Sequence, residues 1–302
     1  MKKKSGYLIF LLFLTFACGN LQGEQASTNI KIKVDGLTRT AEIHLPAAYD
    51  KSRPLPLVIL FHGSRGDGKS LMGTGFNEIS DKYNCIAVYP DGIAGDHTWN
   101  SLFGRIPEGE GVLSDKVDDI AFTRGLIKEL SASYRIDALK IYVCGISAGG
   151  YMAARAAVEL SDIIAAAGIV CGSLGIKSQN GKPASLAIPD PLAPVSVIQI
   201  CGMKDNIVNF AGAQTPKNLF KSAEDCIKYF VKANNCSESP VETKDSARGL
   251  TRRIYSNGRN STEVKLVLVN AAGHTWPTLK NHGISANEEL WNFFYKHPKK
   301  AD

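Results

Sequence analysis

Several features that mark common protein classes are missing from this sequence. It contains no C-x-x-C pair, which excludes a zinc knuckle and a thioredoxin-type site. It has no internal repeat and no long low-complexity linker that would divide the chain. Its long apolar segment, Tyr7–Ala17, falls well short of the ~20 residues that span a bilayer. These absences leave a globular protein of ordinary composition.

The charge balance is equally mild. The formal net charge is +6, and residues 1–17 carry three lysines and no acidic residue, so the rest of the chain carries +3. A small charge that is spread evenly does not indicate a nucleic-acid-binding surface. The hydrophobic content of 44% is ample for a buried core.

The N-terminal segment predicts export. Lys2–Lys4 precede the apolar run Tyr7–Ala17, which is the pattern of a secretory signal peptide. The stretch Thr15–Cys18 resembles a lipobox, in which the chain is cut before a cysteine that is then acylated. The resemblance is imperfect because a leucine is more usual in place of Thr15. We expect Cys18 to be lipidated, with an ordinary cleaved signal or an uncleaved anchor as the alternatives.

This interpretation divides the chain into three parts. Residues 1–17 are expected to be the signal peptide, 18–28 a polar tether, and 29–302 a single catalytic domain. About 275 residues is a common size for one α/β enzyme domain. The protein is therefore expected to be a membrane-anchored lipoprotein, periplasmic or on the cell surface, and otherwise secreted.

Six cysteines follow the lipobox and allow 15 pairings, among which the sequence does not choose. Cys144 and Cys201 lie in apolar runs and are interpreted as buried thiols. Cys226 and Cys236 flank a helical stretch and could form a disulfide in an oxidising compartment. The full set is Cys85, Cys144, Cys171, Cys201, Cys226 and Cys236.

Apolar strands and amphipathic helices alternate along the chain. The alternating runs Asn29–Val34 and Arg39–Leu45 flank Asp35-Gly36 and predict an antiparallel hairpin. Continuous apolar runs separated by helices predict a mostly parallel sheet with helices on both faces, an α/β fold. The expected strands are Leu57–Phe61, Ile86–Tyr89, Ile141–Gly145, Ala165–Cys171, Val195–Cys201 and Val264–Val269. The expected helices are Asp115–Ser133, Ala148–Leu160, Thr215–Asn234 and Ala286–Tyr295.

One loop imitates a nucleotide site. Gly63–Ser70 reads G-S-R-G-D-G-K-S and matches the P-loop pattern after an apolar strand. A P-loop should open a firm helix, yet Gly73 and Gly75 follow, and each glycine costs ~1 kcal/mol in a helix interior. Tyr89–Asp91 could pose as a Walker B acid, but nothing else completes the set. We therefore predict no nucleotide binding at Gly63–Ser70.

A second glycine motif lies in a more demanding context. Gly145–Gly149 reads G-I-S-A-G between an apolar strand and an alanine-rich helix, which is the setting of a nucleophile elbow. Such a turn lifts the Oγ atom of Ser147 clear of the sheet. It also points the N–H of Ala148 toward a developing oxyanion. The loop after the earlier strand supplies the second oxyanion donor in such folds, here the N–H of Ser64 or Gly63.

The elbow requires an acid and then a histidine, each just past a later strand. Asp205 follows the run VIQICG, and His274 follows VKLVLVN. His274 alone lies both downstream of the acid and at a strand end; the other histidines are His44, His62, His97, His282 and His297. The pair Asp118-Asp119 is interpreted as the start of a helix, which favours acidic side chains, and not as catalytic.

The same residues resemble a known group of α/β-hydrolases, the polyhydroxybutyrate depolymerase-like esterases together with feruloyl and acetylxylan esterases. The resemblance extends from about Thr38 to Tyr295. It rests on LVILFHGS, VYPDG, Trp99-Asn100, VDDIAFTRGLI, GISAGGYMA, CGMKDNIV and AGHTWP. The chain departs from many members at Cys201, where they carry histidine, and at Ser64, where they carry cysteine. The resemblance implies an α/β-hydrolase fold, secretion and no metal, and we expect no cofactor.

The predicted function is that of a secreted serine esterase acting on feruloyl or acetyl esters of plant polysaccharide. Ser147, Asp205 and His274 would be catalytic, and Trp276, Trp99 and His62 are suggested as substrate contacts. The alternatives are a polyhydroxyalkanoate depolymerase or short-chain polyester hydrolase, and an acyltransferase or peptidase with the same triad. A non-catalytic glycan-binding surface lipoprotein is the alternative outside enzymes.

Overall fold

The computed structural model describes residues 28–34, 36–93, 97–103, 117–179, 182–183 and 188–300. The predicted signal peptide at residues 1–17, the lipidated Cys18 and nearly all of the tether lie outside the described residues. Within the described residues, no helix is long and apolar enough to span a bilayer.

The strands of the large sheet are β1 Thr28–Val34, β2 Leu37–His44, β3 Leu55–Phe61, β4 Ile86–Pro90, β5 Ile136–Ile146, β6 Ala166–Val170, β9 Ser196–Gly202, β12 Val241–Asp245, β13 Leu250–Tyr255 and β14 Val264–Val269. A small sheet contains β7 Gly175–Gln179, β8 Lys182–Pro183, β10 Ala213–Gln214 and β11 Asn218–Phe220. The helices are α1 Gly68–Met72, α2 Phe76–Tyr83, α4 Asp119–Ser133, α5 Ala148–Glu159, α6 Ala223–Asn234, α7 Leu279–His282 and α8 Ala286–Lys296, with a 3-10 turn, η1 Arg259–Ser261.

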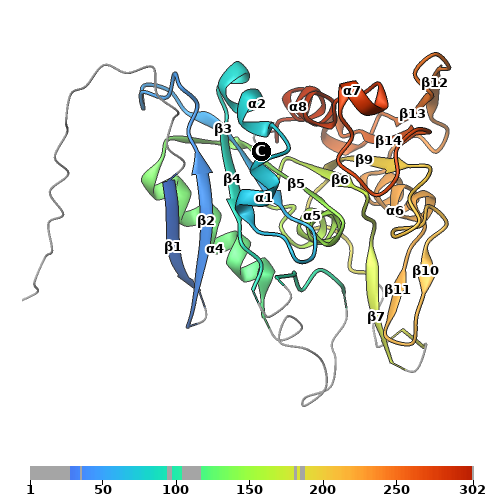
Figure 1. The fold of residues 1–302 in the computed structure, drawn as a ribbon, viewed down its shortest axis with the longest axis horizontal. Coiled ribbons are helices and arrows are strands. Elements are labelled where there is room, and N and C mark those ends of the chain that lie inside the picture. The colour runs from blue at the N-terminus through green and yellow to red at the C-terminus, as the bar shows by residue number, and fades with distance from the viewer. Residues whose placement is uncertain are drawn as a thin grey trace, which may run out of the picture.

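The large sheet has the predicted architecture. Its strand order is β1-β2-β4-β3-β5-β6-β9-β14-β13-β12, and the run from β4 to β14 is parallel. The hairpin β1–β2 is antiparallel and forms one edge, on the left of Figure 1, as expected from the turn at Gly36. The fold is therefore an α/β-hydrolase-type sheet, and all parallel strands end at one edge, where the predicted site residues lie.

Helices cover both faces of this sheet. On one face, α4, α5 and α6 pack against inward side chains such as Leu57, Ile59 and Phe61 of β3. On the other face, α1, α2 and α8 pack against the alternate residues Val58 and Leu60. Burial of both faces explains why the central strands have continuous apolar sequences and not alternating ones.

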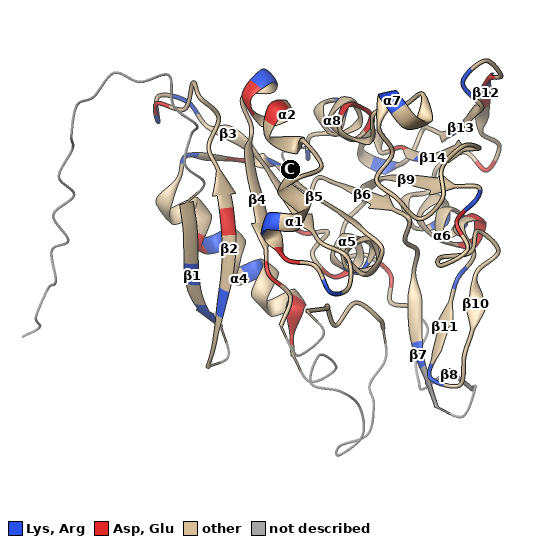
Figure 2. Ribbon diagram, in the orientation of Figure 1, with Lys and Arg blue, Asp and Glu red and all other residues tan. Residues whose placement is uncertain are grey.

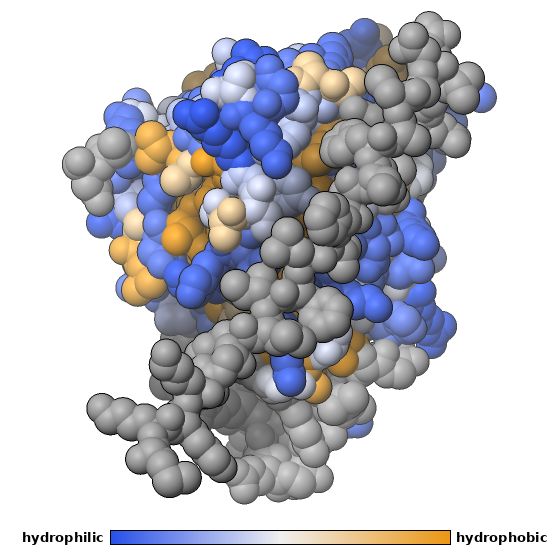
Figure 3. All heavy atoms as spheres, turned by 90° about the vertical axis from the view of Figure 1, so that its left-hand side faces the viewer, coloured by the Kyte–Doolittle hydropathy of each residue, from blue (hydrophilic) through white to orange (hydrophobic). Residues whose placement is uncertain are grey.

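The edges of the sheet are polar. In β1 the side chains of Lys31 and Lys33 are exposed, which discourages pairing with a further strand. Figure 3 views this side, and where grey atoms do not cover it hydrophilic residues predominate, with smaller hydrophobic areas between them. Basic and acidic residues are interspersed along the described elements (Figure 2), in agreement with the mild charge balance.

Two predicted helices begin later than expected. The prediction Thr215–Asn234 was wrong for its first eight residues, because Asn218–Phe220 forms β11 and pairs with β7. Helix α6 begins only after Ser222, whose hydroxyl accepts the N–H of Asp225. Likewise α4 begins at Asp119, after the cap residue Asp118. The small sheet and the antiparallel strands β12 and β13 were not predicted.

The predicted helix start at Asp118-Asp119 is confirmed, and the two carboxylates have different roles. Asp118 accepts the N–H groups of Ile120 and Ala121. Asp119 is buried and forms a 2.8 Å ion pair with the buried guanidinium of Arg39. This pair connects the β1–β2 hairpin to α4 through the interior of the molecule.

All six cysteines of the described residues are buried free thiols. The prediction for Cys144 and Cys201 is confirmed. The suggested Cys226–Cys236 disulfide is not formed, since Cys236 Sγ instead donates to the carbonyl oxygen of Thr262 at 3.7 Å.

Removal of one partner of the buried pair should destabilise the fold. In an Asp119→Ala variant, Arg39 would remain charged in the interior without its carboxylate, so we expect the free energy of unfolding to fall by about 3–5 kcal/mol. The matched control is Arg124→Ala, which breaks an exposed pair with Asp162 and should change stability by less than about 1 kcal/mol. Urea titration followed by circular dichroism measures both; equal losses would contradict the role of Arg39–Asp119.

Candidate active site

Ser147 lies at a strained turn between β5 and α5. It is the N-cap residue of α5 and has φ 57° and ψ −124°, a conformation that is costly for a residue with a side chain. Its N–H donates to the carbonyl oxygen of Val170 at the end of β6. The residue is half-buried. This is the geometry expected of a nucleophile elbow.

Glycines allow the elbow to press against its neighbours. A Cβ atom on Gly149 would lie 2.0 Å from the carbonyl oxygen of Phe61, and one on Gly145 would lie 2.4 Å from the carbonyl oxygen of Gly149. A Cβ atom on Gly150 would lie 2.8 Å from the carbonyl oxygen of Val170. Any larger residue would force α5 away from β3 and β6.

The loop after β3 lies directly beside the elbow. A Cβ atom built on Gly63 would meet the Cβ atom of Ser147 at 3.4 Å. Among the described residues, the N–H groups of Gly63 and Ser64 donate to no other protein group. The side chain of Ser64 bonds to that of Thr98 at 3.3 Å. The loop therefore offers free N–H donors near Ser147, at the position expected for an oxyanion hole with Ala148, the first residue of α5.

The P-loop-like segment Gly63–Ser70 does not have the conformation of a phosphate-binding loop. A helix does open there, α1, but it has only five residues and ends at Gly73. Its cap is Asp67, which accepts the N–H of Ser70, and the N–H of Gly68 donates to Asp91 at 2.8 Å. Carboxylates thus occupy N–H groups that a P-loop would present to phosphate.

Asp205 and His274 lie together at the carboxyl edge of the sheet. Nδ1 of His274 is 2.8 Å from Oδ2 of Asp205, whose side chain is only 2% exposed. The other carboxylate oxygen accepts the N–H groups of Ile207 and Val208. Burial raises the pKa of Asp205, but the bonds from His274, Val208 and Ile207 outweigh it, so the pKa is lowered. The carboxylate therefore stays charged and orients the imidazole.

Cys171 is a third member of this cluster, and it was missed as a site residue. Its backbone is left-handed, with φ 46°, directly after β6. Its thiol donates to the carbonyl oxygen of Thr275 at 3.3 Å and approaches that of Gly273 at 3.8 Å, on either side of His274. Burial raises the pKa of Cys171 to about 12, so it is a protonated thiol and not a nucleophile. Only its position after a buried strand could have drawn attention to it.

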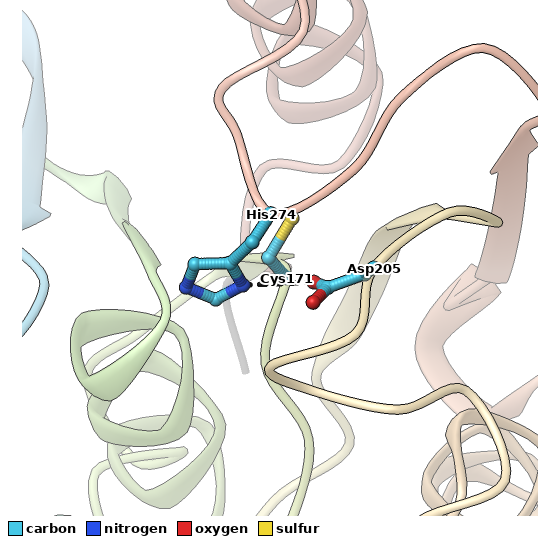
Figure 4. Close-up of side chains that lie close together, drawn as sticks. All are labelled: Cys171, Asp205 and His274. Carbon is cyan, nitrogen blue, oxygen red and sulfur yellow. Dashed lines mark hydrogen bonds and ion pairs between the residues drawn. The ribbon is translucent and has the colours of Figure 1, made fainter.

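These contacts connect the elbow to the histidine loop. Val170 accepts the N–H of Ser147, and its neighbour Cys171 bonds to both sides of His274. A Cβ atom on Gly202 would lie 2.3 Å from the carbonyl oxygen of Gly273, so the acid and histidine loops are also in close contact. Figure 4 shows the side chains of His274 and Asp205 turned toward each other, with Cys171 beside them on a separate segment and its sulfur directed toward the loop that carries His274.

The suggested substrate contacts have packing roles. His62, Trp99 and Trp276 are at most 7% exposed. The indole N–H of Trp99 donates to the carbonyl oxygen of His62, and that of Trp276 donates to Asn287. Nε2 of His62 accepts the N–H of Gly92, and burial lowers the pKa of His62, which keeps it neutral. These side chains stabilise the loops around the site and present little surface to a ligand.

Comparison with known proteins shows that part of the chain is similar to a family of esterases. Residues 40–184, which include the elbow, match the family described as esterase PHB depolymerase. A putative esterase, NocK, from Nocardia uniformis subsp. tsuyamanensis is 27% identical over 273 residues, covering 84% of this chain and 75% of that protein. Feruloyl esterase B from Piromyces equi is 27% identical over 246 residues, covering 78% of this chain and 42% of that protein.

The solved structures agree on the fold. An acetyl xylan esterase from Aspergillus awamori superposes with a TM-score of 0.60 at 13% sequence identity, covering 89% of this chain and 99% of that one. The parallel sheet, the antiparallel hairpin at its edge and the strand–elbow–helix unit are all in keeping with this match. Over residues 40–184 the chain is thus similar to the esterase PHB depolymerase family, and its fold is of the α/β-hydrolase type.

Proposed function

We propose that this protein is an exported serine esterase that hydrolyses feruloyl or acetyl esters carried on plant polysaccharide. The observation that carries the proposal is the hydrogen bond between His274 and Asp205 at the carboxyl ends of the parallel strands. Among the described residues, Ser147 is the only serine with a strained backbone at a turn from a strand into a helix. The match of residues 40–184 to the esterase PHB depolymerase family supports esterase chemistry in general.

In this mechanism the three side chains act in sequence. The hydroxyl oxygen of Ser147 attacks the ester carbonyl while Nε2 of His274 takes the hydroxyl proton. Asp205 holds the Nδ1–H tautomer and stabilises the imidazolium that forms. The imidazolium then protonates the leaving alcohol, and a water molecule activated by His274 releases the acyl group from Ser147.

The developing negative charge falls on the carbonyl oxygen. The N–H of Ala148 and one from Ser64 or Gly63 would bind it, each lowering the barrier by ~3 kcal/mol. The contact of Gly63 with the Cβ atom of Ser147 supports this assignment, because it brings the second loop within reach of the same oxygen.

The relatives support the proposed substrate class. The similarity to feruloyl esterase B and to a bifunctional acetylxylan esterase/xylanase from Neocallimastix patriciarum, 22% identical over 170 residues, favours feruloyl or acetyl esters of polysaccharide. A poly(3-hydroxyalkanoate) depolymerase from Paucimonas lemoignei, 20% identical over 261 residues, favours polyester as the second candidate. The chain spans 75% of the NocK esterase but only 42% of feruloyl esterase B, so the whole activities of these relatives are not transferred to it.

An export route fits such substrates, because polymers do not enter the cell. We include in the proposal a signal peptide at residues 1–17, a lipid anchor on Cys18 and a catalytic domain from residue 29. Labelling of the expressed protein with a palmitate analogue, with Cys18→Ala as the control, tests the anchor.

Replacement of the nucleophile should abolish hydrolysis. Against a panel of acetyl, feruloyl and short hydroxyalkanoate esters, we expect Ser147→Ala to lower kcat/KM by about 10⁶-fold on every ester that the wild type cleaves. Ser196→Ala is the control, since Ser196 is a buried serine at the start of β9, at the opposite end of the parallel strands from Ser147. Unchanged hydrolysis by Ser147→Ala would show that the nucleophile is another residue. Inactivity of the wild type on every ester would instead favour a glycan-binding protein.

Loss of the negative charge on Asp205 should lower the turnover rate and leave substrate binding largely unchanged. We expect Asp205→Asn to lower kcat by about 10³–10⁴-fold with little change in KM, because the neutral amide no longer stabilises the imidazolium. Glu263→Gln is the control, since Glu263 makes a comparable 3.1 Å contact with His297 outside the site. A loss confined to KM, or an equal loss in both variants, would contradict the proposed role.

A further inference from the structure

Three side chains of the types that bind zinc converge beside the catalytic pair. The Sγ atom of Cys171, a carboxylate oxygen of Asp205 and a ring nitrogen of His274 all lie within 4.8 Å of one another (Figure 4). They come from the ends of β6, β9 and β14, which are neighbours in the sheet. Among the described residues no other group of three such ligands meets this spacing.

The spacing is close to that of a tetrahedral metal site. Zinc lies about 2.3 Å from sulfur and about 2.0–2.2 Å from nitrogen or oxygen, so neighbouring ligand atoms are separated by about 3.3–3.7 Å. The 2.8 Å contact between His274 and Asp205 would need to lengthen slightly, and the sulfur would need to move inward by about 1 Å. A cavity of about 10 Å³, lined by Cys171 and Asp205, lies next to the cluster and gives these side chains room to adjust.

We propose that Cys171, Asp205 and His274 form an inhibitory site for a thiophilic divalent cation of the Zn²⁺ or Cd²⁺ type. The cation would be an inhibitor and not a resident cofactor, because it would replace the hydrogen bond between His274 and Asp205 on which the proposed hydrolysis depends. The inhibitory effect therefore rests on the proposed function, whereas the binding of the cation does not.

The proposed inhibition follows from the tautomer of the imidazole. In the resting pair the Nδ1–H of His274 faces Asp205, and Nε2 keeps a lone pair for the proton of Ser147. A cation on Nδ1 needs that nitrogen's lone pair, so the ring proton moves to Nε2. The thiol of Cys171 loses its proton to solvent as the metal–sulfur bond forms, and each bound cation releases one proton in total. The ring then has no lone pair for Ser147.

The ligand set also determines which cations bind. A thiolate and an imidazole select soft or borderline cations, whereas Mg²⁺ and Ca²⁺ require oxygen ligands. His274 is 17% exposed, which makes it the side of the cluster that an entering cation reaches first. We therefore expect Zn²⁺ and Cd²⁺ to inhibit, and Mg²⁺ to have no effect.

The test uses the full chain with CdCl₂, ZnCl₂ or MgCl₂ alone. The near-ultraviolet absorption of a Cd²⁺–thiolate bond reports binding, and initial rates on a small soluble ester report inhibition. The variants are Cys171→Ser and a control, Cys236→Ser, which removes the most exposed of the six thiols, at 8%. Each is compared with its own metal-free rate. We expect one cadmium per wild-type or Cys236→Ser molecule, with loss of hydrolysis, and at least about tenfold weaker binding and inhibition in Cys171→Ser.

Each outcome decides the proposal. Cadmium absorption that persists in Cys171→Ser, or that disappears in Cys236→Ser, would overturn the site. Stoichiometric absorption without loss of hydrolysis would overturn the inhibition. If Cys171→Ser fails to fold, Cys171→Ala is measured in its place. If the wild type hydrolyses no ester, the proposed function fails, while the cadmium absorption still decides whether the site exists.

Discussion

The close approach of α5 to the ends of β3 and β6 is the constraint on which the rest of the site depends. Gly145, Gly149 and Gly150 have no side chains to hold the helix away from neighbouring carbonyl oxygens. As a result Ser147 is held in its strained turn against the loop that contains Gly63. Van der Waals exclusion at a few backbone atoms thus determines both the accessibility of the hydroxyl and the position of the N–H groups beside it.

A second set of contacts holds the opposite half of the site. Asp205 is bonded by the backbone of its own loop, and His274 is bonded by Asp205. Cys171 connects this pair to β6 through carbonyl oxygens on both sides of the histidine. The imidazole is therefore held by a charged partner, and the backbone on both sides of it is held by a weak sulfur donor.

The strand ends could be predicted from the sequence because buried parallel strands have continuous apolar sequences. Ser147, Asp205 and His274 each follow such a run, and the structure has a strand before each of them. Cys171 follows one too, but a cysteine after an apolar strand has the same sequence signature as a core thiol. Its left-handed backbone and its bonds to the histidine loop depend on how β6 lies relative to β14, which no local pattern encodes.

Strand pairing between β11 and β7 also explains why α6 begins later than the sequence predicts. Leu219 and Phe220 are apolar and would suit a helix, yet residues 218–220 pair with β7, and Ser222 provides a helix cap only after that. The P-loop match failed for a related reason. The same glycines and hydroxyl are present, but Asp67 and Asp91, whose proximity is set by the fold, bond to the N–H groups first.

The six buried thiols would behave differently in the unfolded chain. Burial raises the pKa of each of them, which suppresses the thiolate that oxidants and alkylating reagents attack. The native fold needs no oxidising partner to assemble, yet an extended chain would present all six sulfurs to its surroundings at once. The cysteines are therefore protected by packing. The rate at which thiol reagents modify them should report the rate of global unfolding.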